Sequence, residues 1–307
     1  MSKNTTKIII GVVAGLLLLL ILAGIGFYQY VYIPSQVVDN VNLNLEVVRS
    51  SNKKTLDTLN SLADKLERTP ATPANYKNYV DSIKQEQQKL NEISSTADSN
   101  QQKIQDGLND DTKNFANSSR NMIKAEQELV QKLNGQMENT VCIVDKLSQI
   151  NDIADKSTQA LRGNATTTEQ SLKILRSAAD STSNLSKGIQ DIKTCFNGEF
   201  SSLLTPGLKA DIDTDSQKLD SFQKNILDLV SAVEKNNAAG ANKAAASLKD
   251  FATFNPKIFS NPDLSRAITS PTEKLQQSIL EYRQKTDEFR KAYDSIKTKY
   301  KLEEVKI

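Results

Sequence analysis

The stretch LQQSILEYRQKTDEFRKAYDSIKTKY, Leu275 to Tyr300, decides the fold class of this chain. Its apolar and aromatic residues alternate at intervals of four and three, with one polar position. They are Leu275, Ile279, Tyr282, Thr286, Phe289, Tyr293, Ile296 and Tyr300. Because such intervals place side chains on one face of an α-helix, the stretch predicts an amphipathic helix with a buried face.

The same spacing recurs along most of the chain after residue 34. Comparable stripes run through residues 38–66, 76–108, 115–133, 143–161, 172–196 and 219–233. No segment shows a convincing alternation of period two, which would indicate a strand. Helices joined by short turns lie antiparallel. The sequence therefore predicts an all-α fold, an elongated array of antiparallel helical hairpins that resembles a bundle or coiled coil.

Glycine and proline suggest where these helices end. Pro70 and Pro73 interrupt the first stripe, Gly135 ends the third, and Thr166 with Glu169 forms a capping-box pattern before the fifth. The stripes lapse near Pro206-Gly207, which has the composition of a turn. We therefore predict two helical subdomains, residues 33–205 and 206–307.

The aromatic residues of the last stripe allow two interpretations. Tyr282, Phe289, Tyr293 and Tyr300 are either core residues against neighbouring helices or a stripe that binds a partner. The heptad stripes also leave self-association open.

An uncharged run, IIIGVVAGLLLLLILAGIGF, spans Ile8 to Phe27. At about 1.5 Å per residue, twenty helical residues cross the roughly 30 Å hydrocarbon core of a bilayer. The run also lacks the polar face of a water-soluble core helix. We therefore predict a single transmembrane helix over residues 8–32.

Four aromatic residues follow this run, and the flanks set its orientation. Phe27, Tyr28, Tyr30 and Tyr32 suit the membrane–water interface. Lys3 and Lys7 make residues 1–7 a basic cytoplasmic leader, so residues 33–307 are extracytoplasmic. The alternative is a cleaved signal peptide ending near Gly24-Ile25-Gly26, but the apolar run is long for one.

Composition argues against catalysis and nucleic-acid binding. The chain has no histidine, which removes the commonest general base and transition-metal ligand. The formal net charge is +2, which gives no field to attract nucleic acid. Its glycines form no phosphate-binding loop. We expect no enzyme activity and no cofactor.

Cys142 and Cys195 are the only cysteines. In an exported chain such a pair indicates a disulfide, with two buried free thiols as the alternative. If the helices that carry them turn near Gly163 to Thr167, Cys142 faces a residue near 188 to 190. That is about one and a half helical turns short of Cys195, so the bond requires a frayed end or a longer turn.

DIDTD, Asp211 to Asp215, resembles the opening of a calcium loop, with Asp211, Asp213 and Asp215 as weak metal candidates. Ser216 occupies the position of the required glycine, and Phe222 that of the bidentate glutamate. The alternative is that Asp213 or Thr214 caps a helix beginning near Asp215. We expect no metal site.

These features favour a non-catalytic protein of the cell envelope, anchored in the lipid bilayer. We expect a surface-displayed scaffold, spacer or protein-binding module that contacts another envelope protein or polymer. The alternative is an extracytoplasmic sensor or regulatory subunit that acts through a membrane partner. A third, weaker hypothesis is an envelope hydrolase using the carboxylates of residues 211–215.

Overall fold

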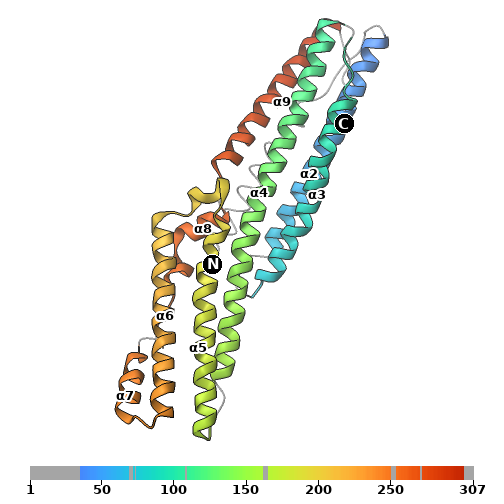
Figure 1. Ribbon diagram of the computed structural model, residues 1–307. Coiled ribbons are helices and arrows are strands. Elements are labelled where there is room, and N and C mark those ends of the chain that lie inside the picture. The colour runs from blue at the N-terminus through green and yellow to red at the C-terminus, as the bar shows by residue number, and fades with distance from the viewer. Residues whose placement is uncertain are drawn as a thin grey trace. The chain divides into compact units, whose positions relative to one another are not determined.

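The computed structural model describes residues 35–68, 72, 74–107, 109–161, 165–249, 254–269 and 272–300. It is helical, and no strand occurs within these ranges (Figure 1). The chain forms two compact units. Unit 1 comprises Met1–Pro70, Asn78–Glu138 and Ser270–Ile307, and unit 2 comprises Ala71–Lys77 and Asn139–Thr269. In the sequence, the main part of unit 2 thus lies between two segments of unit 1.

The described part of unit 1 contains four helical segments. They are α2 (Ser35–Arg68), α3 (Tyr76–Lys103), the first part of α4 (Asp110–Leu161) and α9 (Glu273–Tyr300). In Figure 1 α2 lies beside α3, and α9 lies beside the first part of α4. Contacts between successive helices connect Ser61 with Glu86, Asn91 with Asn134, Gln136 with Thr272 and Asn52 with Tyr282. A second contact in the first three of these pairs joins Asn44 with Gln105, Gln101 with Gln127 and Phe115 with Phe289. In each pair higher residue numbers on one helix meet lower numbers on the other, so the segments form an antiparallel four-helix bundle.

The predicted stripes supply the core of this bundle. In α2 the buried stripe residues include Val41, Leu45, Val48, Leu59 and Leu62. The heptad stripes are therefore buried against other helices of the same chain. The spacing of the stripe over residues 76–108 predicts Gln87 as the core position between Ile83 and Leu90, and this is wrong, because Glu86 is buried in α3 and Gln87 is only half-buried.

Side-chain amides fix the connection between α3 and α4. Asn44 of α2 is fully buried, donates to the carbonyl of Gln105 at 3.0 Å and accepts from its N–H at 2.8 Å. Asn109 accepts the N–H of Thr112 at 3.0 Å and so caps the start of α4. Asp110 and Asp111 in the first turn complement the positive end of the helix dipole.

The predicted helix end at Gly135 is wrong, because α4 continues through it to Leu161. A glycine inside a helix costs about 1 kcal/mol relative to alanine. Burial of Leu133 and Met137 on either side outweighs that cost, since each buried side chain contributes roughly 1.5–3 kcal/mol.

Unit 2 is built on the second part of α4, α5 (Thr168–Asp191) and α6 (Pro206–Glu234). Shorter elements complete it: η1 (Ile192–Cys195), η2 (Gly198–Leu203), α7 (Ala238–Ser247), η4 (Lys257–Ser260) and α8 (Pro262–Thr269). The core between α5 and α6 includes Ala178, Ala179 and Ile226. Small residues on α5 allow close approach of α6, and the Ser186 and Ser216 hydroxyls meet there at 2.7 Å.

A disulfide joins Cys142 of α4 to Cys195 at the end of η1, with 5.6 Å between the Cα atoms. Two contacts continue the same pairing toward the turn. Lys146 Nζ lies 3.6 Å from Asp191 Oδ2, and a Cβ on Gly188 would come within 2.9 Å of Ile150 Cγ1. Each step of four residues along α4 matches three or four residues back along α5 and η1.

The predicted pairing of Cys142 with residues 188–190 is therefore wrong by more than one turn. Thr167, not Thr166, caps α5 by accepting the N–H of Gln170. The second helix therefore begins one residue later than the capping-box pattern predicted. The chain then continues past α5 as the 3₁₀-helix η1, which brings Cys195 level with Cys142.

The structure also places the start of α6 earlier than predicted. Pro206 is the first residue of α6, and Thr205 caps it by accepting the N–H of Leu208 at 3.1 Å. Proline suits this position because the first helical residues need no hydrogen-bonded N–H. The predicted boundary between 205 and 206 differs from the division into units, since both residues lie in unit 2.

None of the helices in the described ranges combines the length and apolar character that crossing a bilayer requires. The predicted transmembrane segment 8–32 lies outside the described residues, as do the interface aromatics Phe27, Tyr28, Tyr30 and Tyr32 and the leader 1–7.

Candidate functional site

A layer of buried polar side chains crosses the core of unit 1. Three helices contribute to it, and all members but the half-buried Asn52 are buried in the bundle. Its members are Ser51, Asn52 and Thr55 from α2, Glu126 from α4, and Tyr282 and Thr286 from α9. Ser51, Thr55, Glu126, Tyr282 and Thr286 are each at most 3% exposed. A buried polar group is costly unless it is hydrogen-bonded, so this layer is the strongest departure from simple core packing.

Glu126 is the ionisable residue at the centre of the layer. Burial raises its pKa from 4.5 to about 7, and the hydroxyls of Thr55 and Ser51 act in the opposite direction. Those hydroxyls do not fully satisfy the carboxyl, because Glu126 Oε1 and Thr55 Oγ1 each lack a hydrogen bond of good geometry. The carboxyl is therefore held in a site that favours its neutral form.

Tyr282 connects the layer across α9 and α2. Its hydroxyl donates to Asn52 Oδ1 at 2.6 Å. Burial, reinforced by the nearby Glu126 carboxyl, raises the pKa of Tyr282 well above its ordinary value, so the phenol stays protonated. The phenol consequently serves as a hydrogen-bond donor that fixes the register of the two helices.

Glu86 of α3 is a second buried carboxyl in unit 1. Unlike Glu126, it lies beside positively charged groups. Lys65 Nζ lies 2.7 Å from Glu86 Oε1, Lys89 Nζ lies 2.9 Å from it, and Ser61 donates to it at 3.2 Å. Burial acts to raise the pKa of Glu86, but the hydrogen bonds and charges of Lys65 and Lys89 lower it overall. Glu86 is therefore an ionised structural residue.

Glu86→Gln is expected to destabilise unit 1 by about 1 kcal/mol at pH 7, since both lysine ammonium groups are partly exposed and screened. Because folding lowers the pKa of Glu86, its contribution is present above pH 4.5 and is lost as the pH falls through the folded value. Urea unfolding at pH 7 and at pH 3 should show a difference from wild type only at pH 7. Glu92→Gln, an exposed change on the same helix, serves as the control.

The three aspartates of DIDTD do not converge in the structure. They lie inside α6, where positions 211 and 215 share one face and position 213 lies on the opposite one. Asp211 accepts from Asn261 Nδ2 at 2.7 Å and Asp215 from the N–H of Ile258 at 2.9 Å. Asp213 instead pairs with Lys193, which lowers its pKa.

The predicted cap at Asp213 or Thr214 is wrong for the same reason, because the helix already began at Pro206. Asp211 and Asp215 anchor the segment around η4 to α6, and Asp213 anchors η1. Within the described ranges, no three Asp, Glu, His or Cys side chains are placed to share a metal ion.

The aromatic stripe of α9 lies in the core of unit 1. Tyr282, Phe289 and Tyr293 are between 1% and 5% exposed. The Phe289 ring stacks on Phe115 at a centroid distance of 5.2 Å, and Tyr293 lies 6.1 Å from Phe115. These residues are therefore not available to a partner, which corrects that interpretation, while the side chain of Tyr300 lies outside the described part.

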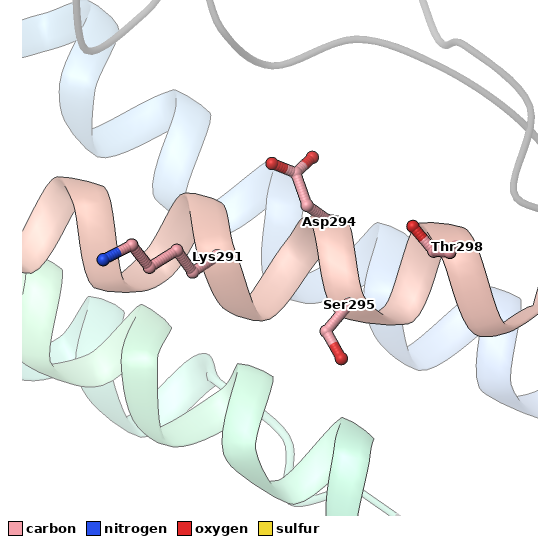
Figure 2. Close-up of a pocket in the computed structure, with 4 residues that line it drawn as sticks. All are labelled: Lys291, Asp294, Ser295 and Thr298. Atoms are coloured by element: carbon pink, nitrogen blue, oxygen red, sulfur yellow. The ribbon is translucent and has the colours of Figure 1, made fainter.

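A shallow hollow of about 480 Å³ lies over the last turns of α9. It is lined by Lys291, Asp294, Ser295 and Thr298, all from that one helix (Figure 2). Figure 2 shows Asp294 and Ser295 pointing in different directions. Side chains that diverge from a single helix cannot enclose a ligand, so the hollow is a poor candidate for a binding site.

Sequence reasoning missed Glu126 and Glu86, although a signal for both exists. Glu126 lies four residues after Met122 and three before Leu129, which are stripe positions, and Glu86 lies three after Ile83 and four before Leu90. A charged residue in phase with an apolar stripe indicates a buried charge.

No protein-family model, curated protein or solved structure matches this chain.

Proposed function

We propose that this chain is a non-catalytic, membrane-anchored scaffold or protein-binding module of the cell envelope. The observation that carries the proposal is the uncharged run from Ile8 to Phe27, which is long enough to span a bilayer and is followed in the sequence by residues 33–307. The anchor places the two helical units outside the cytoplasm.

The disulfide supports this placement. Bonds between cysteines persist in oxidising compartments outside the cytoplasm and are rare within it. Cys142 and Cys195 account for every cysteine of the chain, so no thiol is left over for catalysis or metal binding.

The packing of the carboxylates supports a structural role over a hydrolytic one. A hydrolase needs two groups that converge on one substrate bond. Glu86 is bound by two lysines, Asp211 by Asn261 and Asp213 by Lys193. Each carboxylate joins two elements of the fold, as expected of a scaffold.

A tag at the carboxyl end tests the anchor and its orientation. Protease added to intact cells or spheroplasts should remove the tag, and deletion of residues 8–32 should move the protein to the soluble fraction. A cytoplasmic protein of similar size should resist the protease in the same sample. Survival of the tag until the membrane is broken would reverse the proposed orientation.

The second candidate is an extracytoplasmic sensor or regulatory subunit acting through a membrane partner. The polar layer around Glu126 favours it, because an incompletely satisfied core is less stable and easier to rearrange than an apolar one. Crosslinking in membranes followed by capture tests both candidates. A scaffold should retain its partner in all conditions, and a sensor should change its crosslinks when a stimulus is applied.

A further inference from the structure

We propose that unit 1 is a pH-responsive four-helix bundle, held tightly packed when the Glu126 carboxyl is protonated and loosened when it ionises. The inference rests on the polar layer and is independent of the membrane anchor. The group that titrates, the Glu126 carboxyl, lies in the core of unit 1 and not on its surface.

The two buried glutamates of unit 1 provide an internal comparison. Glu86 and Glu126 are 0% and 2% exposed. Glu86 has two lysine ammonium groups within 2.9 Å, which compensate its charge. Beside Glu126 lie the neutral hydroxyls of Ser51, Thr55 and Tyr282, and its Oε1 has no hydrogen-bond partner in the described residues. A carboxylate buried without a cation pays the full cost of desolvation, whereas a neutral carboxyl does not.

Among the described residues, no charged group of a neighbouring helix contributes to the shift in the pKa of Glu126. From α9, Tyr282 is neutral, and the positive charge of Arg290 acts on the Tyr282 phenol. From α2 come the two hydroxyls and Arg49, whose Nε is buried. Burial and those hydroxyls account for the shift in the pKa of Glu126, without a contribution from either arginine.

The third neighbour, α3, is located by Gln127, which donates to the carbonyl of Ser94 at 3.1 Å and to Asp98 at 3.5 Å. Asp98 is exposed, and the buried residue on this stretch is Ala97. On α4 itself, Lys124 and Glu128 face solvent and pair with each other at 4.0 Å. Asp98, Lys124 and Glu128 thus lie at the surface, whereas Arg49 and Arg290 have buried guanidinium nitrogens but do not contribute to the shift in the pKa of Glu126.

The sign of the pH dependence follows from the direction of the shift. Folding raises the pKa of Glu126 from 4.5 to about 7, so between these values the folded state holds one more proton. The stabilising effect of the neutral carboxyl is complete below pH 4.5 and is lost as the pH rises to about 7. From pH values well below 4.5 to values well above 7, the unfolding equilibrium constant should increase roughly 300-fold in total.

Glu126→Gln removes this dependence while keeping the size of the side chain. In urea unfolding of the full-length protein in detergent, the variant should match wild type near pH 5. At pH 8 its unfolding equilibrium constant should be about 70-fold lower than that of the wild type, since it has no charge to bury. Glu128→Gln, an exposed change on the same helix, should behave as wild type at both pH values. Equal pH dependence in wild type and Glu126→Gln would overturn the proposal.

Hydrogen exchange locates the effect, with unit 2 as the reference in the same molecule. After correction for the intrinsic exchange rate, amides of α2 and α9 in the wild type should lose protection between pH 5.5 and 8, while those of α5 and α6 should not. Equal loss in both units would overturn the assignment to unit 1.

If Glu126→Gln does not fold, ¹³C NMR titration of labelled glutamate carboxyls in the wild type decides the question. One buried carboxyl should titrate near pH 7, and every carboxyl titrating near its ordinary value would contradict the inference.

Discussion

Replacing both Cys142 and Cys195 by serine is expected to lower the free energy of unfolding of unit 2 by about 4 kcal/mol. The two residues are 53 apart in sequence, and the bond closes a loop that contains the end of α4 and all of α5. A covalent link over such a loop removes conformations from the unfolded chain, and this accounts for most of the stabilisation in the chain-entropy description.

The native contacts around the bond should survive its loss. The Lys146–Asp191 ion pair and the close approach of Gly188 to Ile150 hold the same register one and two turns away. The α5–α6 interface retains the Ser186–Ser216 contact at 2.7 Å. We therefore expect a protein that keeps its helix content and unfolds at lower urea concentration.

Unfolding monitored by circular dichroism, with and without reductant, measures this effect. Reductant should weaken the wild type to the level of the double-serine variant and leave that variant unchanged. Hydrogen exchange should increase in α5 and α6 more than in α2 and α9. A wild type that unfolds identically in oxidising and reducing buffer would show that the bond does not stabilise the protein.

The sequence was sufficient to predict the helices, because their stripes are long and regular, but several of their ends were wrong. A glycine such as Gly135 reports a local cost of about 1 kcal/mol, which the burial of its neighbours exceeds. Pro206-Gly207 is equally compatible with a turn and with the first turn of a helix. Thr205 caps α6, so Pro206 and Gly207 form the first turn of that helix. From the sequence alone, a threonine is recognised as a cap only when a helix is known to begin at the next residue.

The site was less accessible from the sequence than the fold. The phase of the stripes indicates that Glu86 and Glu126 are buried, but the charge state of each depends on residues from other helices. Lys65 reaches Glu86 from α2, 21 positions earlier, and Tyr282 approaches Glu126 from α9, 156 positions later. One sequence cannot specify such pairs before the order and register of the helices are known.

Phe115→Ala is expected to destabilise unit 1 by about 4 kcal/mol, the other large effect we anticipate. Phe115 is fully buried on α4, and its ring contacts Phe289 at 5.2 Å and Tyr293 at 6.1 Å between centroids. Truncation removes the apolar surface of the ring, leaves a cavity between α4 and α9, and loses aromatic contacts worth roughly 1 kcal/mol each.

The matched control for Phe115→Ala is Leu280→Ala, a truncation in α9 at a side chain that is 61% exposed, which should change stability by less than about 0.5 kcal/mol. Urea unfolding of both variants against wild type provides the comparison. If α9 closes the four-helix bundle, Phe115→Ala should also increase hydrogen exchange along α9, although the substitution lies on α4. A loss below about 1 kcal/mol would mean that α9 does not pack on α4, and the bundle of unit 1 would then have to be replaced by an arrangement of three helices.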